Sequence, residues 1–350
     1  MKEFPDEQDQ SEQEELYEHH RVVVDKGQTP LRIDKFLMAR LQNVSRSRLQ
    51  DAAEANSILV NTKPAKSSYK VKPGDIISIV LAHPPRILEV IAEDIPLEIV
   101  YEDDDLVVIN KPAGLVVHPG YGNYSGTLVN ALAYRFHPDK LGKSIEAETE
   151  RPGLVHRIDK NTSGLIVVAR NERAMTHLAK QFFDRTIKRH YHALIWGGFD
   201  QDSGTITGHI GRNQTDRKAM DVYPDGSQGK HAVTHWRKIE AFSYVTLVEC
   251  KLETGRTHQI RAHMKFAGHP LFNDELYGGK KILRGTTFSK YRQFVENCFS
   301  LIPGQALHAR SLGFKHPVTG KDVYFEADPP EGFKALVERW RKYSVESAGE

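Results

Sequence analysis

Apolar and polar residues recur along this chain in patterns that predict a small folding unit followed by a larger one. Over residues 21–82, Ile33, Phe36 and Leu37 recur at the spacing of one helix face. Ser45 belongs to the residue types that cap helix N-termini well, so a second short helix is expected to begin after it. The small unit is therefore expected to start with two short helices.

Two strands are expected to complete the small unit. One begins over residues 58–61 and the other covers residues 76–81, with a lysine-rich turn between them. Residues 1–20 are acidic and polar, and we interpret them as a disordered tail. Residues 83–96 open with His-Pro-Pro-Arg and are interpreted as a linker.

The larger unit, over residues 97–345, shows a pattern of consecutive strands with helices inserted between some of them. A hairpin is expected from residues 97–101 and 106–110, which flank three consecutive aspartates. Thr127 and Asn171 are expected to cap helices. Further elements are expected as strands at 191–196, 233–239 and 245–252, a hairpin over 307–325, and helices at 257–264 and 333–340. This order predicts an α+β fold on a central, mostly antiparallel mixed sheet with flanking helices.

The helix after Asn171 has an apolar pattern of its own. Met175, Leu178, Ala179 and Phe182 recur at helical spacing, so this face is expected to pack on the sheet.

Composition places the chain among globular proteins rather than membrane or disulfide-stabilised ones. Hydrophobic residues make up 39% of its 350 residues, and the apolar runs are far shorter than a membrane helix needs. Cys250 and Cys298 are isolated in sequence, which argues against a disulfide framework or a zinc site. A cytoplasmic location is therefore expected.

Charge is unevenly distributed, although the formal net charge is only +2. Residues 1–18 hold eight acidic residues and one lysine, whereas residues 21–72 hold eleven Lys and Arg against four acids. A compact basic segment is what a protein that contacts phosphates would carry, although a solvated surface explains charge alone equally well.

The highest concentration of polar and charged side chains lies between Gly153 and Leu165. Seven of the eight residues from His156 to Ser163 are polar or charged, between two apolar runs. Such crowding favours a functional loop, but a turn held by side-chain hydrogen bonds is the alternative. A kinase motif is excluded because Ile158 interrupts His-Arg-Asp. Zinc hydrolase spacing is also absent, since His258 and His263 are five apart with no Glu between them.

The segment His156-Arg157-Ile158-Asp159-Lys160-Asn161-Thr162-Ser163-Gly164 resembles the His-Arg-Leu-Asp-x-x-Thr-Ser-Gly motif of the RluA family of pseudouridine synthases. The one departure is Ile158 in place of Leu. Three further stretches match the family in order, at residues 105–120, 185–194 and 254–264. The segments at 31–37, 45–49, 58–61 and 71–75 resemble the S4 RNA-binding module that precedes the catalytic domain in part of this family.

This resemblance implies an isomerase that converts uridine in RNA to pseudouridine without a metal or other cofactor. It implies that Asp159 is the catalytic nucleophile, that Arg261 is its bidentate partner and that Tyr191 stacks on the flipped base. Residues implied in binding RNA or the base are Arg157, which fills the gap in the RNA, Ile260, Arg256, Lys111 and His118, with Arg46 and Arg48 in the S4 module. Thr162 and Ser163 are expected to order the catalytic loop.

Shared features at residues 95–97, 120–123 and 305–309 resemble most closely the members that modify large-subunit ribosomal RNA. A monomer that acts on this RNA, or on a pre-ribosomal particle, is therefore expected. The alternatives are the same chemistry on another ribosomal RNA site or on tRNA, a non-catalytic RNA-binding ribosome-assembly factor, and an RNA glycosidase with paired carboxylates. The order of chemical steps, acylal or glycal, stays open at this level.

Overall fold

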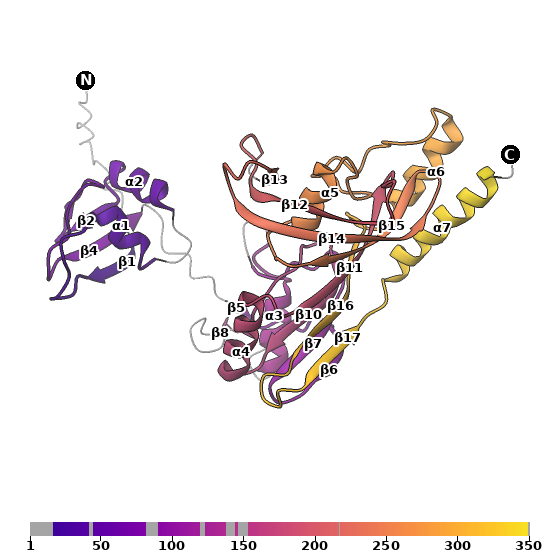
Figure 1. Ribbon diagram of the computed structural model, residues 1–350. Helices are drawn as coiled ribbons and strands as arrows, with labels where there is room; N and C mark the ends of the chain where they lie inside the picture. Colours follow the sequence, from indigo (N-terminus) through magenta and orange to yellow (C-terminus); the bar gives the residue numbers. More distant parts are fainter. Residues whose placement is uncertain are drawn as a thin grey trace, which may run out of the picture. The chain divides into compact units, whose positions relative to one another are not determined.

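The computed structural model describes residues 17–41, 45–81, 90–119, 123–137, 144–145, 153–216 and 218–348. The chain divides into two compact units, Met1–Ile87 and Leu88–Glu350 (Figure 1). Each unit buries a hydrophobic core of its own. No helix in the described ranges is both long enough and apolar enough to cross a membrane.

The first unit packs two helices on a four-stranded sheet with the order β1-β4-β2-β3. Its elements are β1 (Tyr17–Val23), α1 (Ile33–Met38), α2 (Arg46–Glu54), β2 (Ile58–Val60), β3 (Lys63–Pro64) and β4 (Ile76–Leu81). Ile33, Phe36 and Leu37 are fully buried, as their spacing predicts. The Ser45 side chain accepts a hydrogen bond from the Arg48 backbone N–H, which confirms the predicted cap.

The first strand corrects the predicted disordered tail. Tyr17–Val23 pairs antiparallel with β4, so the prediction of disorder is wrong for residues 17–20, and residues 1–16 lie outside the described part of the chain. The strand lies at the edge of its sheet, where backbone pairing on one side stabilises a segment that has few apolar side chains. Its polar composition therefore gave no strand signal.

The start of the second unit corrects the predicted linker. Val90–Ile91 forms β5, which pairs with β8 (Ser144–Ile145). Val90 and Ala92 are buried in a small core with α3 residues. The second half of the predicted linker is thus part of the folded second unit, and residues 83–89 lie outside the described residues.

The second unit is built on an 11-stranded sheet with the order β13-β12-β14-β15-β11-β16-β10-β7-β6, to which β17 adds beside β16 and β9 beside β10. Every strand pair in this sheet is antiparallel except β10 with β16. The predicted mostly antiparallel mixed sheet is confirmed. The strands are β6 (Glu98–Glu102), β7 (Leu106–Lys111), β9 (Gly153–Leu154), β10 (Ser163–Ala169), β11 (Lys188–Trp196), β12 (Ser203–Arg212), β13 (Met220–Tyr223), β14 (Lys230–Ala241), β15 (Val245–Leu252), β16 (Leu307–Lys315) and β17 (Asp322–Glu326).

Five described helices flank this sheet (Figure 1). They are α3 (Leu128–Phe136), α4 (Glu172–Phe183), α5 (Gln259–Phe266), α6 (Ser289–Phe299) and α7 (Glu331–Ala348). Thr127 and Asn171 cap α3 and α4 as predicted. The sequence patterns did not predict α6, β12 or β13. The helix α5 packs against β12, β13 and β14, which places its N-terminal end at the site described below.

The buried face of α4 differs from the predicted one. Ala174 and Leu178 are fully buried, whereas Met175 is 45% exposed and Ala179 is also exposed. Leu178 and Phe182 pack against the core as predicted, Ala174 completes the buried face in place of Met175 and Ala179, and Phe182 also lines a pocket.

Candidate active site

The polar loop of residues 155–162 connects β9 to β10 and carries Asp159. The Asp159 backbone carbonyl accepts the Thr162 N–H at 3.1 Å. The Thr162 hydroxyl accepts a hydrogen bond from Gln305 Nε2, also at 3.1 Å, and Ser163 Oγ lies 2.9 Å from His308 Nδ1. These contacts tie the C-terminal end of the loop to β16 and to the segment before it, as expected for Thr162 and Ser163.

A glycine makes the close parallel pairing of β10 with β16 feasible. Gly164 lies beside Ala309 with φ of +109°, and a Cβ there would lie 2.3 Å from the Ala309 carbonyl oxygen. Only glycine fits this position, because both its backbone angle and its clearance exclude a side chain. The loop that carries Asp159 is thereby held against the β16 strand.

The predicted groove residue Lys111 is buried beneath this loop instead. Its Nζ donates hydrogen bonds to the carbonyl oxygens of Pro112, Leu115 and Lys160 at 2.8, 2.9 and 3.0 Å. Its side chain is 0% exposed, so the prediction that Lys111 lines an RNA groove is wrong. Burial lowers the pKa of Lys111 to about 7, and the nearby Asp159 offsets part of that shift. Lys111 therefore braces the loop from within, next to the nucleophile candidate.

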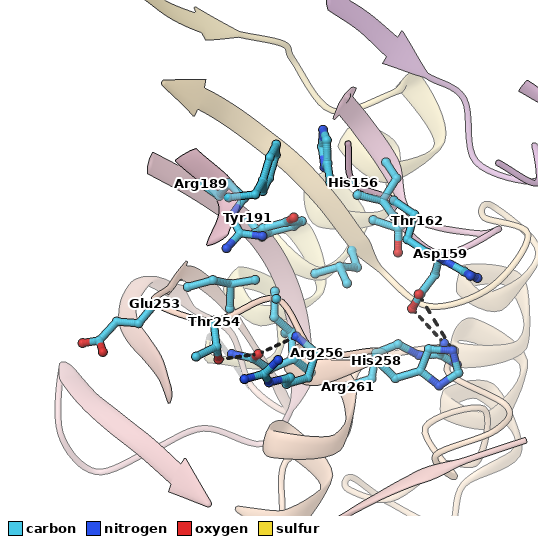
Figure 2. Close-up of a pocket in the computed structure, with 18 of the residues that line it drawn as sticks. His156, Asp159, Thr162, Arg189, Tyr191, Glu253, Thr254, Arg256, His258 and Arg261 are labelled. Carbon is cyan, nitrogen blue, oxygen red and sulfur yellow. Dashed lines mark hydrogen bonds and ion pairs between the residues drawn. The ribbon is translucent and has the colours of Figure 1, made fainter. Parts of the chain in front are cut away.

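Arg261 on α5 contacts Asp159, but not in the predicted bidentate way. Its Nη1 donates to Asp159 Oδ2 at 3.0 Å (Figure 2). Its Nε and Nη2 donate to the two Asp274 oxygens at 2.7 and 2.9 Å. The two-pronged edge of the guanidinium thus binds Asp274, which the sequence patterns did not single out. Burial alone would lower the pKa of Arg261, but the ion pair with Asp274 outweighs it and raises that pKa.

His258 is a further neighbour of Asp159 that the sequence patterns did not assign to this site. Its Nε2 lies 3.8 Å from Asp159 Oδ1, and its Nδ1 lies 3.0 Å from the Tyr277 hydroxyl. The Tyr277 hydroxyl accepts the Met220 N–H at 2.9 Å, which leaves its own hydrogen for His258 Nδ1. When the Tyr277 hydroxyl donates in this way, the remaining ring proton of a neutral His258 is on Nε2, the nitrogen that faces Asp159. Burial lowers the pKa of His258, although Asp159 opposes the shift.

A pocket of about 400 Å³ opens beside Asp159 (Figure 2). Tyr191 on β11 is 7% exposed and lines it with Ile260 and Leu307, which supply apolar surface. Arg157 and Arg256 also line it, and Arg256 Nε donates to the His231 carbonyl at 3.2 Å. The full lining is Val155, His156, Arg157, Ile158, Asp159, Thr162, Phe182, Phe183, Arg185, Arg189, Tyr191, Leu252, Glu253, Thr254, Gly255, Arg256, His258, Gln259, Ile260, Arg261 and Leu307.

His156 opens the sequence motif but serves a structural role in the pocket wall. Its Nε2 accepts the Val167 N–H at 3.0 Å, and its ring stacks on Phe182 with ring centroids 4.5 Å apart. Burial, and then the nearby Arg189, lower the pKa of His156 to about 3. The ring is therefore neutral at physiological pH and joins the motif to β10.

The other predicted RNA-binding residues lie outside this pocket. His118 is exposed on the segment before α3 and is not among the lining residues. In the first unit, Arg48 is exposed, and Arg46 Nε donates to Asp34 Oδ2 at 3.0 Å. Asp34 also binds Arg32, and although burial alone would raise the pKa of Asp34, these two arginines lower it. The buried carboxylate thus orients two basic side chains at one end of α2.

One group of potential metal ligands occurs in the described part of the chain, away from the pocket lining. Asp103, Asp105 and His316 place ligand atoms within 4.8 Å of one another. Asp103 already accepts hydrogen bonds from the Tyr101 hydroxyl, from His316 and from two backbone N–H groups. These hydrogen bonds explain why the three side chains lie together, because they join the β6–β7 hairpin to the β16–β17 hairpin.

Two family models match this chain. The model described as RNA pseudouridylate synthase matches residues 105–266, and the S4 domain model matches residues 31–77. An uncharacterized RNA pseudouridine synthase of Chlorobaculum parvum is 45% identical over 91% of this chain and 96% of its own length. The ribosomal large subunit pseudouridine synthase D of Zymomonas mobilis is 41% identical over 87% of this chain and 92% of its own length.

Two solved human structures share the fold of the larger unit. Human RNA pseudouridylate synthase domain containing 4 aligns with a TM-score of 0.54 and 26% identity, over 70% of this chain and 93% of that one. Human RNA pseudouridylate synthase domain containing 1 aligns with a TM-score of 0.51 and 28% identity, over 73% of this chain and 90% of that one.

Proposed function

The chain belongs to the RNA pseudouridylate synthase family and is an RNA pseudouridine synthase with an S4 domain, and from this premise we propose that Asp159 carries the reaction and that large-subunit ribosomal RNA is the substrate. The observation that carries the proposal is the hydrogen bond between Arg261 and Asp159 at the edge of a nucleotide-sized pocket. A carboxylate held by a guanidinium and open to a pocket is suited to attack on a sugar carbon.

The proposed chemistry fits the groups around Asp159. Pseudouridine formation breaks the N1–C1′ bond of uridine, turns the base and joins C5 to C1′, so that no atom enters or leaves. Asp159 would either bond to C1′ or remove a sugar proton, and the partly exposed carboxylate has one oxygen bound to Arg261 and the other facing His258. Arg261 would keep the first oxygen oriented while the second reacts.

The pocket wall supports a binding mode for the extruded uracil. Tyr191 offers a ring face, and Ile260 and Leu307 offer aliphatic surface. Stacking on an aromatic ring contributes about 1–3 kcal/mol per base, which offsets the few kcal/mol that base extrusion costs. Arg157 is exposed beside Asp159, a position from which it would fill the space that the uridine leaves in the RNA.

Large-subunit ribosomal RNA is the favoured substrate for two reasons. Several relatives at 41–42% identity are named ribosomal large subunit pseudouridine synthase D. The folded S4 domain holds Arg32 and Arg46 on the same carboxylate, Asp34, and Arg48 is exposed on the helix that Arg46 begins. These basic side chains support a contact with phosphates outside the catalytic pocket. Arg256 and His118 would contribute further RNA contacts.

An RNA glycosidase would use a second carboxylate beside Asp159. Asp274, which shares Arg261 with Asp159, has both oxygens bound to that arginine, which argues against this function. The test is quantitative mapping of uridine modification in total RNA from cells with and without the gene. The proposal expects loss of pseudouridine at defined large-subunit positions. Loss confined to tRNA, or abasic sites in place of pseudouridine, would contradict it.

A further inference from the structure

Arg189 is a nearly buried cation that no described part of this chain neutralises. It is 9% exposed and lines the pocket from β11, two residues before Tyr191. Its Nε is sealed from solvent without a hydrogen-bond partner. Among the described residues, the Phe182 ring lies under its guanidinium, with the ring centroid 5.5 Å from the guanidinium carbon, and no carboxylate pairs with it.

Such an arrangement is costly unless a ligand completes it, because an unpaired charge held away from water is strongly disfavoured. The two acids of the pocket are already engaged elsewhere. Asp159 binds Arg261, and Glu253 accepts a hydrogen bond from His235 at 2.6 Å. Neither carboxylate forms an ion pair with Arg189.

The position of Arg189 also indicates a site kept open for a ligand. Along a strand, residues two apart point to the same face, so Arg189 and Tyr191 face the pocket together (Figure 2). Gly255 passes beside the guanidinium, and a Cβ at Gly255 would lie only 2.8 Å from Arg189 Nη1. The absence of a side chain at Gly255 therefore leaves room around the terminal nitrogens.

We propose that Arg189 binds a backbone phosphate of the RNA at the target uridine, and so fixes the strand while the base enters the Tyr191 side of the pocket. A phosphate supplies the missing negative charge and matches the planar geometry of a guanidinium. A uracil carbonyl would accept a hydrogen bond but would leave the charge uncompensated. This inference rests on the proposed function, because it takes the pocket as the place where the RNA is held.

The salt dependence of RNA binding tests this proposal without requiring turnover. The probe is a large-subunit ribosomal RNA stem-loop synthesised with pseudouridine already at the target position, because binding of the product involves no chemistry. Arg189→Gln should weaken binding by about tenfold or more, as expected for a lost charge-assisted contact. The slope of log Kd against log salt should fall by about 0.7 to 0.9, as for one lost phosphate contact. Arg292→Gln, an exposed position on α6, is the matched control and should change neither quantity.

Two further measurements separate phosphate binding from a structural role. Because Arg189 is unpaired in the free protein, Arg189→Gln should leave the urea midpoint unchanged or raise it. Arg189→Lys should keep most of the salt slope. A lower midpoint with an unchanged slope would assign Arg189 to the core and overturn the proposal.

The contact can then be located on the RNA. Methylphosphonate, which removes one negative charge, is placed in turn at each phosphate around the target uridine. One position should weaken binding to the wild-type protein and have little effect on Arg189→Gln, as in a double-mutant cycle between contacting groups. An unchanged salt slope, or the same loss at every position for both proteins, would overturn the phosphate assignment. Because the probe is product RNA, that outcome is independent of whether Asp159 is the nucleophile.

Discussion

Arg261 is bound to Asp274 more extensively than to Asp159. Two nitrogens of its guanidinium contact the two Asp274 oxygens, and the third donates to Asp159. Asp274 is almost fully buried and its backbone neighbourhood is fixed by a turn with Gly279. The direction in which Arg261 points at Asp159 is therefore set by Asp274, which we interpret as a positioning residue.

Asp274→Asn should reduce kcat by about 10- to 100-fold, because a small displacement of a catalytic partner has a cost of this order. Asp274→Ala should also reduce the free energy of unfolding by about 3 to 5 kcal/mol, since it leaves a buried guanidinium with one partner fewer. Turnover assays and urea denaturation measure the two effects. Glu275→Gln, at the exposed neighbouring position, is the control. Wild-type kcat in Asp274→Asn would contradict the positioning role.

Lys111 should matter for loop order rather than for RNA contact. Lys111→Met removes the donor of three buried carbonyl groups and should destabilise the protein by about 1–3 kcal/mol or more. The affinity for RNA, measured at a salt concentration where the variant is folded, should fall by less than kcat does. If Lys111→Met instead lost affinity and salt slope with normal stability, the original groove assignment would be correct.

The Tyr277 hydroxyl should act through His258. Tyr277→Phe keeps the ring over the Arg261 guanidinium, 4.8 Å from its carbon atom, but removes the group that bonds His258 Nδ1. We expect a few-fold lower kcat with little change in KM and a shifted pH profile, because the Nε2 proton that faces Asp159 is no longer fixed. Tyr223→Phe, which removes a hydroxyl bonded to the Arg212 carbonyl, is the control. If the two variants had the same pH profile of kcat, the proposed role of His258 would be wrong.

Acid should destabilise the protein through His156. Its pKa is about 3 in the folded chain, so between its ordinary value of 6.5 and pH 3 the unfolded chain binds a proton that the folded chain does not. The contribution of His156 to the free energy of unfolding is therefore complete above pH 6.5. Below pH 6.5 that contribution falls by up to about 1.4 kcal/mol per pH unit. Urea midpoints at pH 6.5 and 5 should therefore differ less in His156→Gln than in the wild type. His177→Gln, at an exposed position on α4, should behave like the wild type. An equal pH response in all three proteins would contradict the burial argument.

Local signals in the sequence were enough for much of the fold. Ser45, Thr127 and Asn171 cap the helices that they were predicted to cap, because capping depends on one side chain and the next turn. The β6–β7 and β16–β17 hairpins were also predicted correctly, because turn residues separate two apolar segments in each of them. By contrast β10 is buried along its whole length, so its residues show no alternation, and β1 is an edge strand with a polar sequence.

For the site, the motif led to Asp159 and Arg261 but not to their surroundings. Arg189 lies within the matching stretch 185–194, but nothing around it in the sequence indicates a buried guanidinium without an ion-pair partner among the described residues. Asp274 lies outside the matching stretches, and only the tertiary structure joins it to Asp159 through Arg261. Lys111 was expected to bind RNA from the family resemblance alone, whereas here three carbonyl groups accept hydrogen bonds from its buried amine. Asp274 follows directly after Phe272 and Asn273, which are both buried. An acidic residue next to a buried segment was the sequence feature that could have indicated a buried ion pair.

Asp159 is proposed to be the group that reacts at the ribose of the target uridine. The most direct measurement is single-turnover pseudouridine formation by Asp159→Asn on a large-subunit ribosomal RNA stem-loop, with affinity for the same RNA measured in parallel. Asparagine keeps the shape of the side chain and can still contact Arg261, but it cannot attack C1′ or accept a sugar proton. We predict no detectable product and an affinity within a few-fold of the wild type. Product formation at a rate near that of the wild type would contradict the account.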